Sequence, residues 1–256
     1  MNILAIIAVC FFAGMGAGLG TGFAGMSAAA VITPMLVTFL KMEPYEAVGI
    51  ALASDVLASA VSAYTYGKNK NLDIQNGSVM MVFVLLLTLV GSWISSKVSS
   101  NTMGSFSVVM TMLLGVKFIL KPVMTTKETM AQVSPQKRLM QSVICGSLIG
   151  FICGFIGAGG GMMMLLILTS VLGYELKTAV GTSVFIMTAL TGSLSHFAIG
   201  GAPDVTVLVL CILFTFLWAR IAARIANKAE PAFLNRVTGV ILIVLGAVVL
   251  LVNAIT

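Results

Sequence analysis

Charged side chains are scarce in this sequence: Asp, Glu, Lys and Arg make up 9% of its 256 residues, whereas 59% are hydrophobic. A soluble domain carries roughly 25% charged residues, because its surface must face water. The scarcity therefore excludes a water-soluble globular domain of this size. A lipid bilayer is the solvent in which such a composition is stable, so the long apolar stretches are predicted to be membrane segments.

Side chains that support catalysis or metal binding are also few. The chain has one histidine, and its four cysteines lie inside apolar stretches without CxxC spacing. The HExxH and GxSxG motifs are absent, and carboxylates do not cluster. We therefore expect no catalytic residues, no metal and no cofactor, which argues against an intramembrane enzyme. Basic runs interleaved with aromatics are also lacking, so nucleic acid is not an expected partner.

Two of the apolar stretches, residues 3–40 and 141–172, are longer than one crossing requires. A helix needs about 20 residues to cross about 30 Å of hydrocarbon. Each of these stretches contains a cluster of small residues. We predict a break in both, with a new helix beginning near Ser27 in the first and near Gly160 in the second.

The glycines in these clusters follow two patterns. Glycine at every fourth position, from Gly14 to Gly22 and from Gly146 to Gly154, permits close helix packing, and packing alone is an equally good interpretation there. The run from Gly157 to Gly161 contains three consecutive glycines. Each costs about 1 kcal/mol in a helix interior, so this run favours a departure from helical geometry.

The two halves of the chain share one pattern. A shift of 132 positions superimposes the glycine ladder and a second motif, E-x-x-x-A-V-G, on later copies of themselves. The ladder pairs Gly14, Gly18, Gly22, Phe23 and Gly25 with Gly146, Gly150, Gly154, Phe155 and Gly157. The second motif pairs Glu43, Ala47, Val48 and Gly49 with Glu175, Ala179, Val180 and Gly181. We therefore divide the chain into a first transmembrane repeat (1–120), a polar linker (121–140) and a second transmembrane repeat (141–256).

The distribution of basic residues predicts how the repeats are oriented. If each long stretch crosses once, the repeats are parallel, and the fourteen Lys and Arg residues divide seven and seven between the two sides. If each stretch enters and returns, twelve lie on the linker side against Lys41 and Lys97 on the other. Cytoplasmic loops are enriched in Lys and Arg, so inverted repeats and a cytoplasmic linker are predicted. Whether the returning arms cross fully or re-enter is left open.

The predicted fold class is therefore an all-α polytopic membrane protein with two inverted repeats. Each repeat consists of a glycine-broken helix or hairpin followed by three transmembrane helices, which gives about 8–10 membrane segments in total.

These motifs together resemble the TauE/SafE family of sulfite and organosulfonate exporters. The resemblance is strongest from Gly150 to Gly161, in the segment from Glu175 to Ser183, and in the turn from Gly200 to Asp204. The first copy departs from it, because Ile50-Ala51 stands where the second copy has Thr182-Ser183. The resemblance implies a secondary transporter of small anions, such as sulfite or sulfonates, in the cell inner (plasma) membrane.

Broken helices could bind such an anion directly. A helix that starts at the bilayer midplane presents free backbone N–H groups at the positive end of its dipole. Two inverted copies would direct two such helix starts at one central point. The expected substrate-binding residues are Ser27, Ala28, Gly157, Gly159, Gly160, Gly161, Thr182, Ser183, Thr191 and Ser195. For each hydroxyl among them, a bond to its own helix backbone is the competing interpretation.

Two ionisable residues, Asp55 and His196, lie within apolar stretches and are candidates for proton coupling. A charged group at bilayer depth costs at least about 2.5 kcal/mol, so such a group is usually paired, neutral or functional. The competing interpretation places His196 at the interface and has Asp55 bond neighbouring hydroxyls.

Several alternatives remain at this stage. The same broken helices could line an anion channel, or a carrier of a different small carboxylate or sulfur-containing solute. The small anion and the lipid bilayer are the expected partners. The direction of flux, the coupling ion and the presence of a homo-oligomer are left open.

Overall fold

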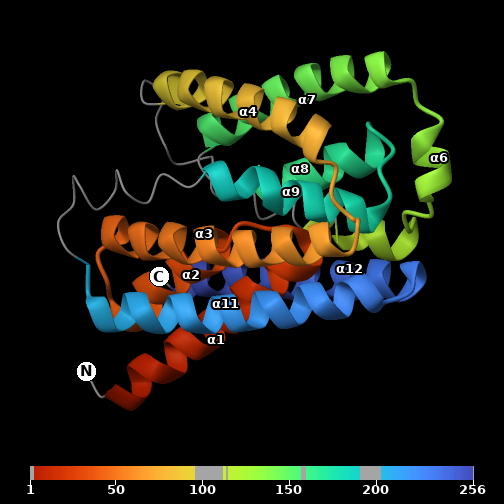
Figure 1. Ribbon diagram of the computed structural model, residues 1–256. Coiled ribbons are helices and arrows are strands. Elements are labelled where there is room, and N and C mark those ends of the chain that lie inside the picture. Colours follow the sequence, from red (N-terminus) through yellow and green to blue (C-terminus); the bar gives the residue numbers. More distant parts are fainter. Residues whose placement is uncertain (1–2, 96–111, 114, 157–159, 191–202, 256) are drawn as a thin grey trace.

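All regular structure in the described part of the chain is helical, as predicted. The computed structural model describes residues 3–95, 112–113, 115–156, 160–190 and 203–255 (Figure 1). The helices of the first repeat and linker are α1 (Ile3–Ala24), α2 (Ala29–Leu40), α3 (Pro44–Lys68), α4 (Ile74–Ser95) and α6 (Lys127–Ala131). The helices of the second repeat are α7 (Pro135–Ile156), α8 (Gly160–Ser170), α9 (Leu176–Leu190), α11 (Val205–Lys228) and α12 (Pro231–Ile255). Residues 115–120 are also helical.

Helices long enough to cross a membrane dominate the fold. Among the described residues, α1, α3, α11 and large parts of α4 and α12 are sufficiently long and apolar. With a rise of about 1.5 Å per residue, helices of this length cover roughly 27–38 Å, which matches the hydrocarbon core. Their outer faces carry exposed apolar side chains, such as Leu89 (71% exposed) and Leu213 (50% exposed). The chain is a multi-pass membrane protein.

The glycine ladders are packing surfaces. A Cβ atom at Gly14, Gly18 or Gly22 would come within 2.4–2.6 Å of side-chain atoms of α11. A Cβ atom at Gly146 or Gly150 would lie 2.9 or 2.4 Å from backbone carbonyls of α4. Helix α1 is unbroken through its ladder, so the packing interpretation holds there. The two ladders bring α1 against α11 and α7 against α4.

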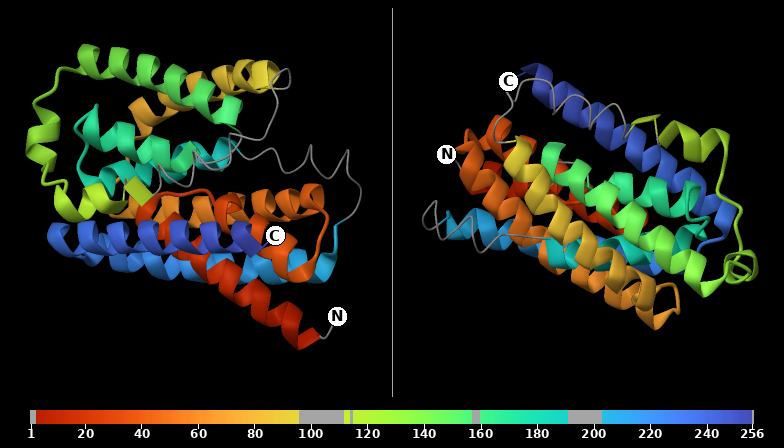
Figure 2. Two further views of the ribbon diagram at one scale, coloured as in Figure 1. Left: turned by 180° about the vertical axis from the view of Figure 1, so that it is seen from behind. Right: turned by 90° about the horizontal axis from the view of Figure 1, so that it is seen from above.

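The short helices α2 and α8 are too short to span. Their 12 and 11 residues rise only about 16–18 Å. Helix α2 folds back along α1. The two helices are so close that a Cβ atom at Gly16 of α1 would lie 3.2 Å from Val31 Cγ1 of α2. Figure 2 shows the chain turning at the end of α1 and returning as α2. The first returning arm is therefore shorter than a full crossing.

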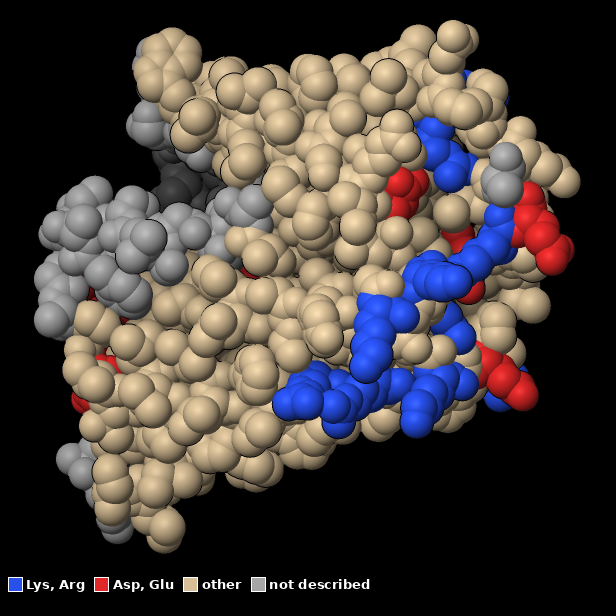
Figure 3. Space-filling view, in the orientation of Figure 1, with Lys and Arg blue, Asp and Glu red and all other residues tan. Residues whose placement is uncertain are grey.

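Loops from both repeats gather at the linker end of the bundle. Lys127 Nζ of α6 donates to the Lys70 carbonyl at 3.0 Å, and the Tyr174 hydroxyl donates to Asp73 Oδ2 at 2.8 Å. The Lys and Arg side chains visible in Figure 3 cluster at this same end. Elsewhere, the Asp204 backbone amide at the start of α11 donates to Glu46 Oε1 at 2.7 Å.

Candidate functional site

The first predicted break lies between α1 and α2. Helix α1 ends at Ala24, and Gly25 has a φ of +63°, a left-handed conformation that glycine adopts without a Cβ clash. The Gly25 and Met26 amides donate back to the Thr21 and Gly20 carbonyls at 3.0 and 3.2 Å. Helix α2 then begins at Ala29, two residues beyond the predicted Ser27.

The carbonyl groups released by this break accept hydrogen bonds from other helices. A helix end leaves carbonyls without partners inside the helix, and such groups are costly to bury unpaired. The donors are the hydroxyls of Tyr66 (α3) to Gly22 O at 2.8 Å, Thr238 (α12) to Phe23 O at 3.1 Å, and Ser183 (α9) to Gly25 O at 3.1 Å. Three helices from both repeats thus hold the break in place.

The start of α2 bonds a carboxyl group of the chain itself. Asp55 of α3 is 1% exposed. The Ser27 hydroxyl donates to Asp55 Oδ2 at 2.6 Å, and the Ser59 hydroxyl donates to Oδ1 at 3.1 Å. The Ala28 backbone amide also bonds this carboxyl, and the Ala29 amide donates to Ser27 Oγ at 3.3 Å. A carboxylate beside the first turn of a helix is stabilised by the free amides and by the dipole.

This arrangement places two predicted substrate-binding residues against Asp55. Ser27 and Ala28 were expected to face a transported anion, but in this structure their donors bond Asp55. The competing interpretation of Asp55, that it bonds neighbouring hydroxyls, describes the contacts seen here.

The second predicted break differs from the first. The described part of α7 reaches Ile156 and that of α8 starts at Gly160, so the predicted break itself lies outside the described residues, and Gly160 and Gly161 lie in the first described turn of α8. Gly157 and Gly159 lie outside the described residues. The shift of 132 positions relates Asp55 to Met187, which is 5% exposed. A thioether carries no charge and is only a weak acceptor, so this position supplies no anion to α8.

The predicted hydroxyl donors divide between described and undescribed residues. The Ser183 hydroxyl donates to the Gly25 carbonyl, as described above. Thr182 Oγ1 accepts a hydrogen bond from the Asp73 amide at 3.2 Å. Both hydroxyls therefore bond backbone groups of the other repeat rather than only their own helix. Thr191, Ser195 and His196 lie outside the described residues.

The glycine of the second A-V-G motif is required by a close approach between repeats. A Cβ atom at Gly181 would lie 2.0 Å from the Asn71 carbonyl and 2.8 Å from Tyr66 Cβ. The loop between α3 and α4 therefore rests directly on α9. This contact explains why the motif has glycine rather than alanine at this position.

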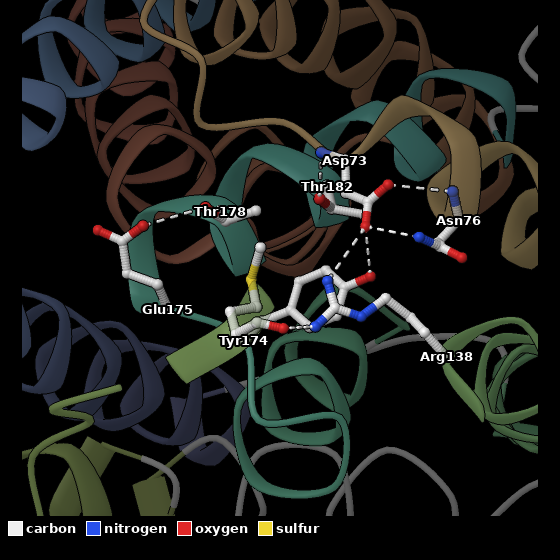
Figure 4. A network of polar contacts seen from close by, with 8 residues as sticks. Asp73, Asn76, Arg138, Tyr174, Glu175, Thr178 and Thr182 are labelled. Carbon is white, nitrogen blue, oxygen red and sulfur yellow. Dashed lines mark hydrogen bonds and ion pairs between the residues drawn. The ribbon is translucent and has the colours of Figure 1, made fainter. Parts of the chain in front are cut away.

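A polar network at the linker end was not found by sequence reasoning (Figure 4). The Asp73 carboxylate accepts hydrogen bonds from the Asn76 backbone amide at 3.1 Å, from the Asn76 side-chain Nδ2 at 2.8 Å and from the Tyr174 hydroxyl at 2.8 Å. Arg138 Nη1 lies 4.0 Å from Asp73 Oδ2, and the guanidinium lies 5.2 Å from the Tyr174 ring centre. Arg138 also donates to the Met130 carbonyl.

The network joins the linker to both repeats. Burial raises the pKa of Tyr174, and the neighbouring Asp73 carboxylate adds to this effect, so the phenol remains a neutral donor. The signal available in the sequence was weak: an aspartate three residues before Asn76 is typical of a helix start, but its partner Tyr174 is 101 residues away.

Comparison with known proteins decides the family. The model of a protein family described as "Sulfite exporter TauE/SafE" matches residues 10–249, nearly the whole chain. The chain belongs to the TauE/SafE family. This family consists of membrane transporters rather than enzymes, which confirms both the predicted resemblance and the predicted class of protein.

Relatives of this TauE/SafE chain carry matching descriptions. "Probable membrane transporter protein YunE" of Bacillus subtilis (strain 168) is 22% identical, covering 90% of this chain and 89% of that protein. "Probable membrane transporter protein YdhB" of the same organism is 21% identical over 85% of this chain and 89% of that protein. "Probable membrane transporter protein MJ0441" of Methanocaldococcus jannaschii is 25% identical, covering 80% of this chain and 79% of that protein. No solved structure matches this TauE/SafE chain.

Proposed function

We propose that this protein is a proton-coupled secondary transporter that moves small anions, namely sulfite or organosulfur and sulfonate compounds, across the cell inner membrane. The observation that supports this most directly is the Asp55 carboxyl group bonded at the start of α2. It indicates that a helix beginning inside this bundle can hold an oxyanion. In this proposal the second copy has the same kind of helix start without the internal carboxylate.

The packing of the helices supports a two-fold relation between the repeats. Under the shift of 132 positions, α1 corresponds to α7, and α4 corresponds to α11. The α1–α11 contact therefore exchanges with the α7–α4 contact, as a two-fold relation between repeats requires. The clustering of basic residues at the linker end favours a cytoplasmic linker.

In this proposal the transported anion binds at the first turn of α8. A helix that starts at Gly160 leaves the amides of Gly160 and Gly161 among its four free amides. Met187 stands where the first copy has Asp55, so the anion of the second site must come from solution. Thr182 and Ser183 lie on α9, the same helix as Met187, and fix this helix against the first repeat.

Asp55 provides the means of coupling anion movement to a proton. Two negative charges in a region of low dielectric repel each other strongly. A proton on Asp55 removes this repulsion, so proton binding and anion binding favour each other. Net movement of one proton with one monovalent anion is also electroneutral, which lowers the cost of crossing the hydrocarbon.

The test places a carboxylate in the second site. In proteoliposomes, Met187→Asp supplies α8 with an internal anion and should reduce uptake of labelled sulfite or sulfoacetate by at least tenfold. Met187→Asn is the matched control, because asparagine has nearly the same shape as aspartate but no charge. This variant should retain most of the uptake. Equal loss in both variants would contradict an anion site at α8.

Coupling is tested with the same vesicles. An inwardly directed proton gradient should drive concentrative uptake by the unmodified protein, whereas a channel would only dissipate an existing anion gradient. Asp55→Asn should leave downhill exchange measurable while abolishing the dependence of uptake on the proton gradient. A gradient dependence that survives Asp55→Asn removes Asp55 from any coupling role.

A further inference from the structure

A groove of about 540 Å³ opens on the surface of the bundle at the linker end of α3. Its walls come from the last two turns of α3, the loop that follows, and α9. The lining residues are Ala63, Tyr64, Gly67, Lys68, Leu72 and Phe185. This volume lies within the range of about 300–1,000 Å³ that is usual for small-ligand sites.

The chemistry of the groove combines an apolar floor with one cation at its edge. Ala63, Leu72 and Phe185 offer only carbon atoms, whereas Lys68 is exposed at the last position of α3. Tyr64, one turn before Lys68, is 70% exposed. An exposed tyrosine followed by a lysine at the end of a spanning helix is typical of the level where hydrocarbon meets headgroups.

We propose that this groove binds an anionic phospholipid, with its phosphate at Lys68 and one acyl chain along Ala63, Leu72 and Phe185. Basic pockets between membrane helices on the cytoplasmic side recognise anionic headgroups. A free inorganic anion would have one cationic partner here, the Lys68 amine, because the other lining side chains are uncharged and mostly apolar. A lipid uses both features, because its charge and its chain occupy different depths.

The groove is connected to the helices that hold the substrate site. A Cβ atom at Gly77 of α4 would lie 3.3 Å from the Phe185 ring and 3.1 Å from Thr182 Cγ2. Phe185 therefore lies between the groove and the contact of α9 with α4. A lipid chain against Phe185 supports this contact from the membrane side.

The experiment titrates the full-length protein in detergent with phosphatidylglycerol, phosphatidylcholine or glycerol 3-phosphate, and counts bound molecules by native mass spectrometry. We expect phosphatidylglycerol to bind at least five times more tightly than phosphatidylcholine, and glycerol 3-phosphate not to bind detectably. Lys68→Gln should weaken phosphatidylglycerol about five-fold, the effect of one lysine at an anionic membrane surface. Lys137→Gln is the control, because Lys137 is exposed at the same end but lies outside the groove.

A second variant tests the wall of the groove. Tyr64→Ala removes an exposed ring, so the fold should be retained, and binding of both phospholipids should weaken. Equal binding of the two phospholipids, equal effects of Lys68→Gln and Lys137→Gln, or unchanged binding in both groove variants would each overturn the proposal. Binding of glycerol 3-phosphate with the affinity of the lipid would instead assign the groove to soluble phosphates. None of these results depends on sulfite transport.

Discussion

The hydrogen bond between Ser27 and Asp55 should be measurable as a coupling between two substitutions. Ser27→Ala removes the 2.6 Å bond to Asp55 Oδ2 and leaves a buried carboxyl without this donor. A hydrogen bond to a charged group contributes about 1.5–3 kcal/mol, and a neutral one about 0.5–1.5 kcal/mol. Since 1 kcal/mol corresponds to about 2–4 °C in Tm for a chain near this size, Ser27→Ala should lower the Tm by roughly 3–12 °C.

The same substitution should cost about half as much when Asp55 is replaced by asparagine, because only a neutral bond is then lost. Thermal unfolding of the four proteins in detergent, followed by circular dichroism, completes the double-mutant cycle. Ser54→Ala is the matched control, since its hydroxyl bonds the Ile50 carbonyl at 2.9 Å on the same helix. It should lower the Tm equally in both backgrounds. If Ser27→Ala also lowered the Tm equally in both backgrounds, the coupling between Ser27 and Asp55 would be refuted.

Three further predictions concern the breaks and the helix contacts. Gly160→Leu should abolish uptake in vesicles while membrane insertion, followed by protease protection, stays intact; unchanged uptake would contradict a site at α8. Gly181→Ala places a Cβ atom 2.0 Å from the Asn71 carbonyl and should lower the Tm by several degrees, as overpacking typically costs about 1–3 kcal/mol. The Cys10 and Cys211 thiols contact each other between α1 and α11, so a membrane-permeant oxidant should link them, whereas Cys10→Ser should prevent the cross-link.

Much of the fold could be predicted because the bilayer constrains composition strongly. Length and hydropathy identify the spanning helices, and α8 is described from Gly160 onward, within the run of glycines. The start of α2 is two residues later than predicted, because Gly25 turns the chain and Ser27 lies in that turn, where its hydroxyl oxygen accepts a hydrogen bond from the Ala29 amide. The shift of 132 positions also anticipates that α1 and α7 occupy corresponding places.

The partners within the site could not be predicted, because they are set by how distant segments pack. Asp55 was recognised as unusual from its position in an apolar stretch, but Ser27 as its donor depends on α2 folding back beside α3. The contact of Tyr174 with Asp73 likewise joins residues that no local pattern relates. For the same reason, the role of Ser183 as a donor to Gly25 emerges only once α9 lies against the break.

The hydroxyls on α3, α9 and α12 that bond the end of α1 restrict which motions the transporter can use. Separating any one of these helices from the break would strand a carbonyl in a medium without water, at a cost of about 1–3 kcal/mol per group. Opening the path to the opposite side of the membrane is thus easier if these four helices travel as one block. The outer pair formed by α4 and α7 carries a bond of the same kind, from the Thr88 hydroxyl to the Gly150 carbonyl at 3.2 Å, so these two helices should move together as a second unit.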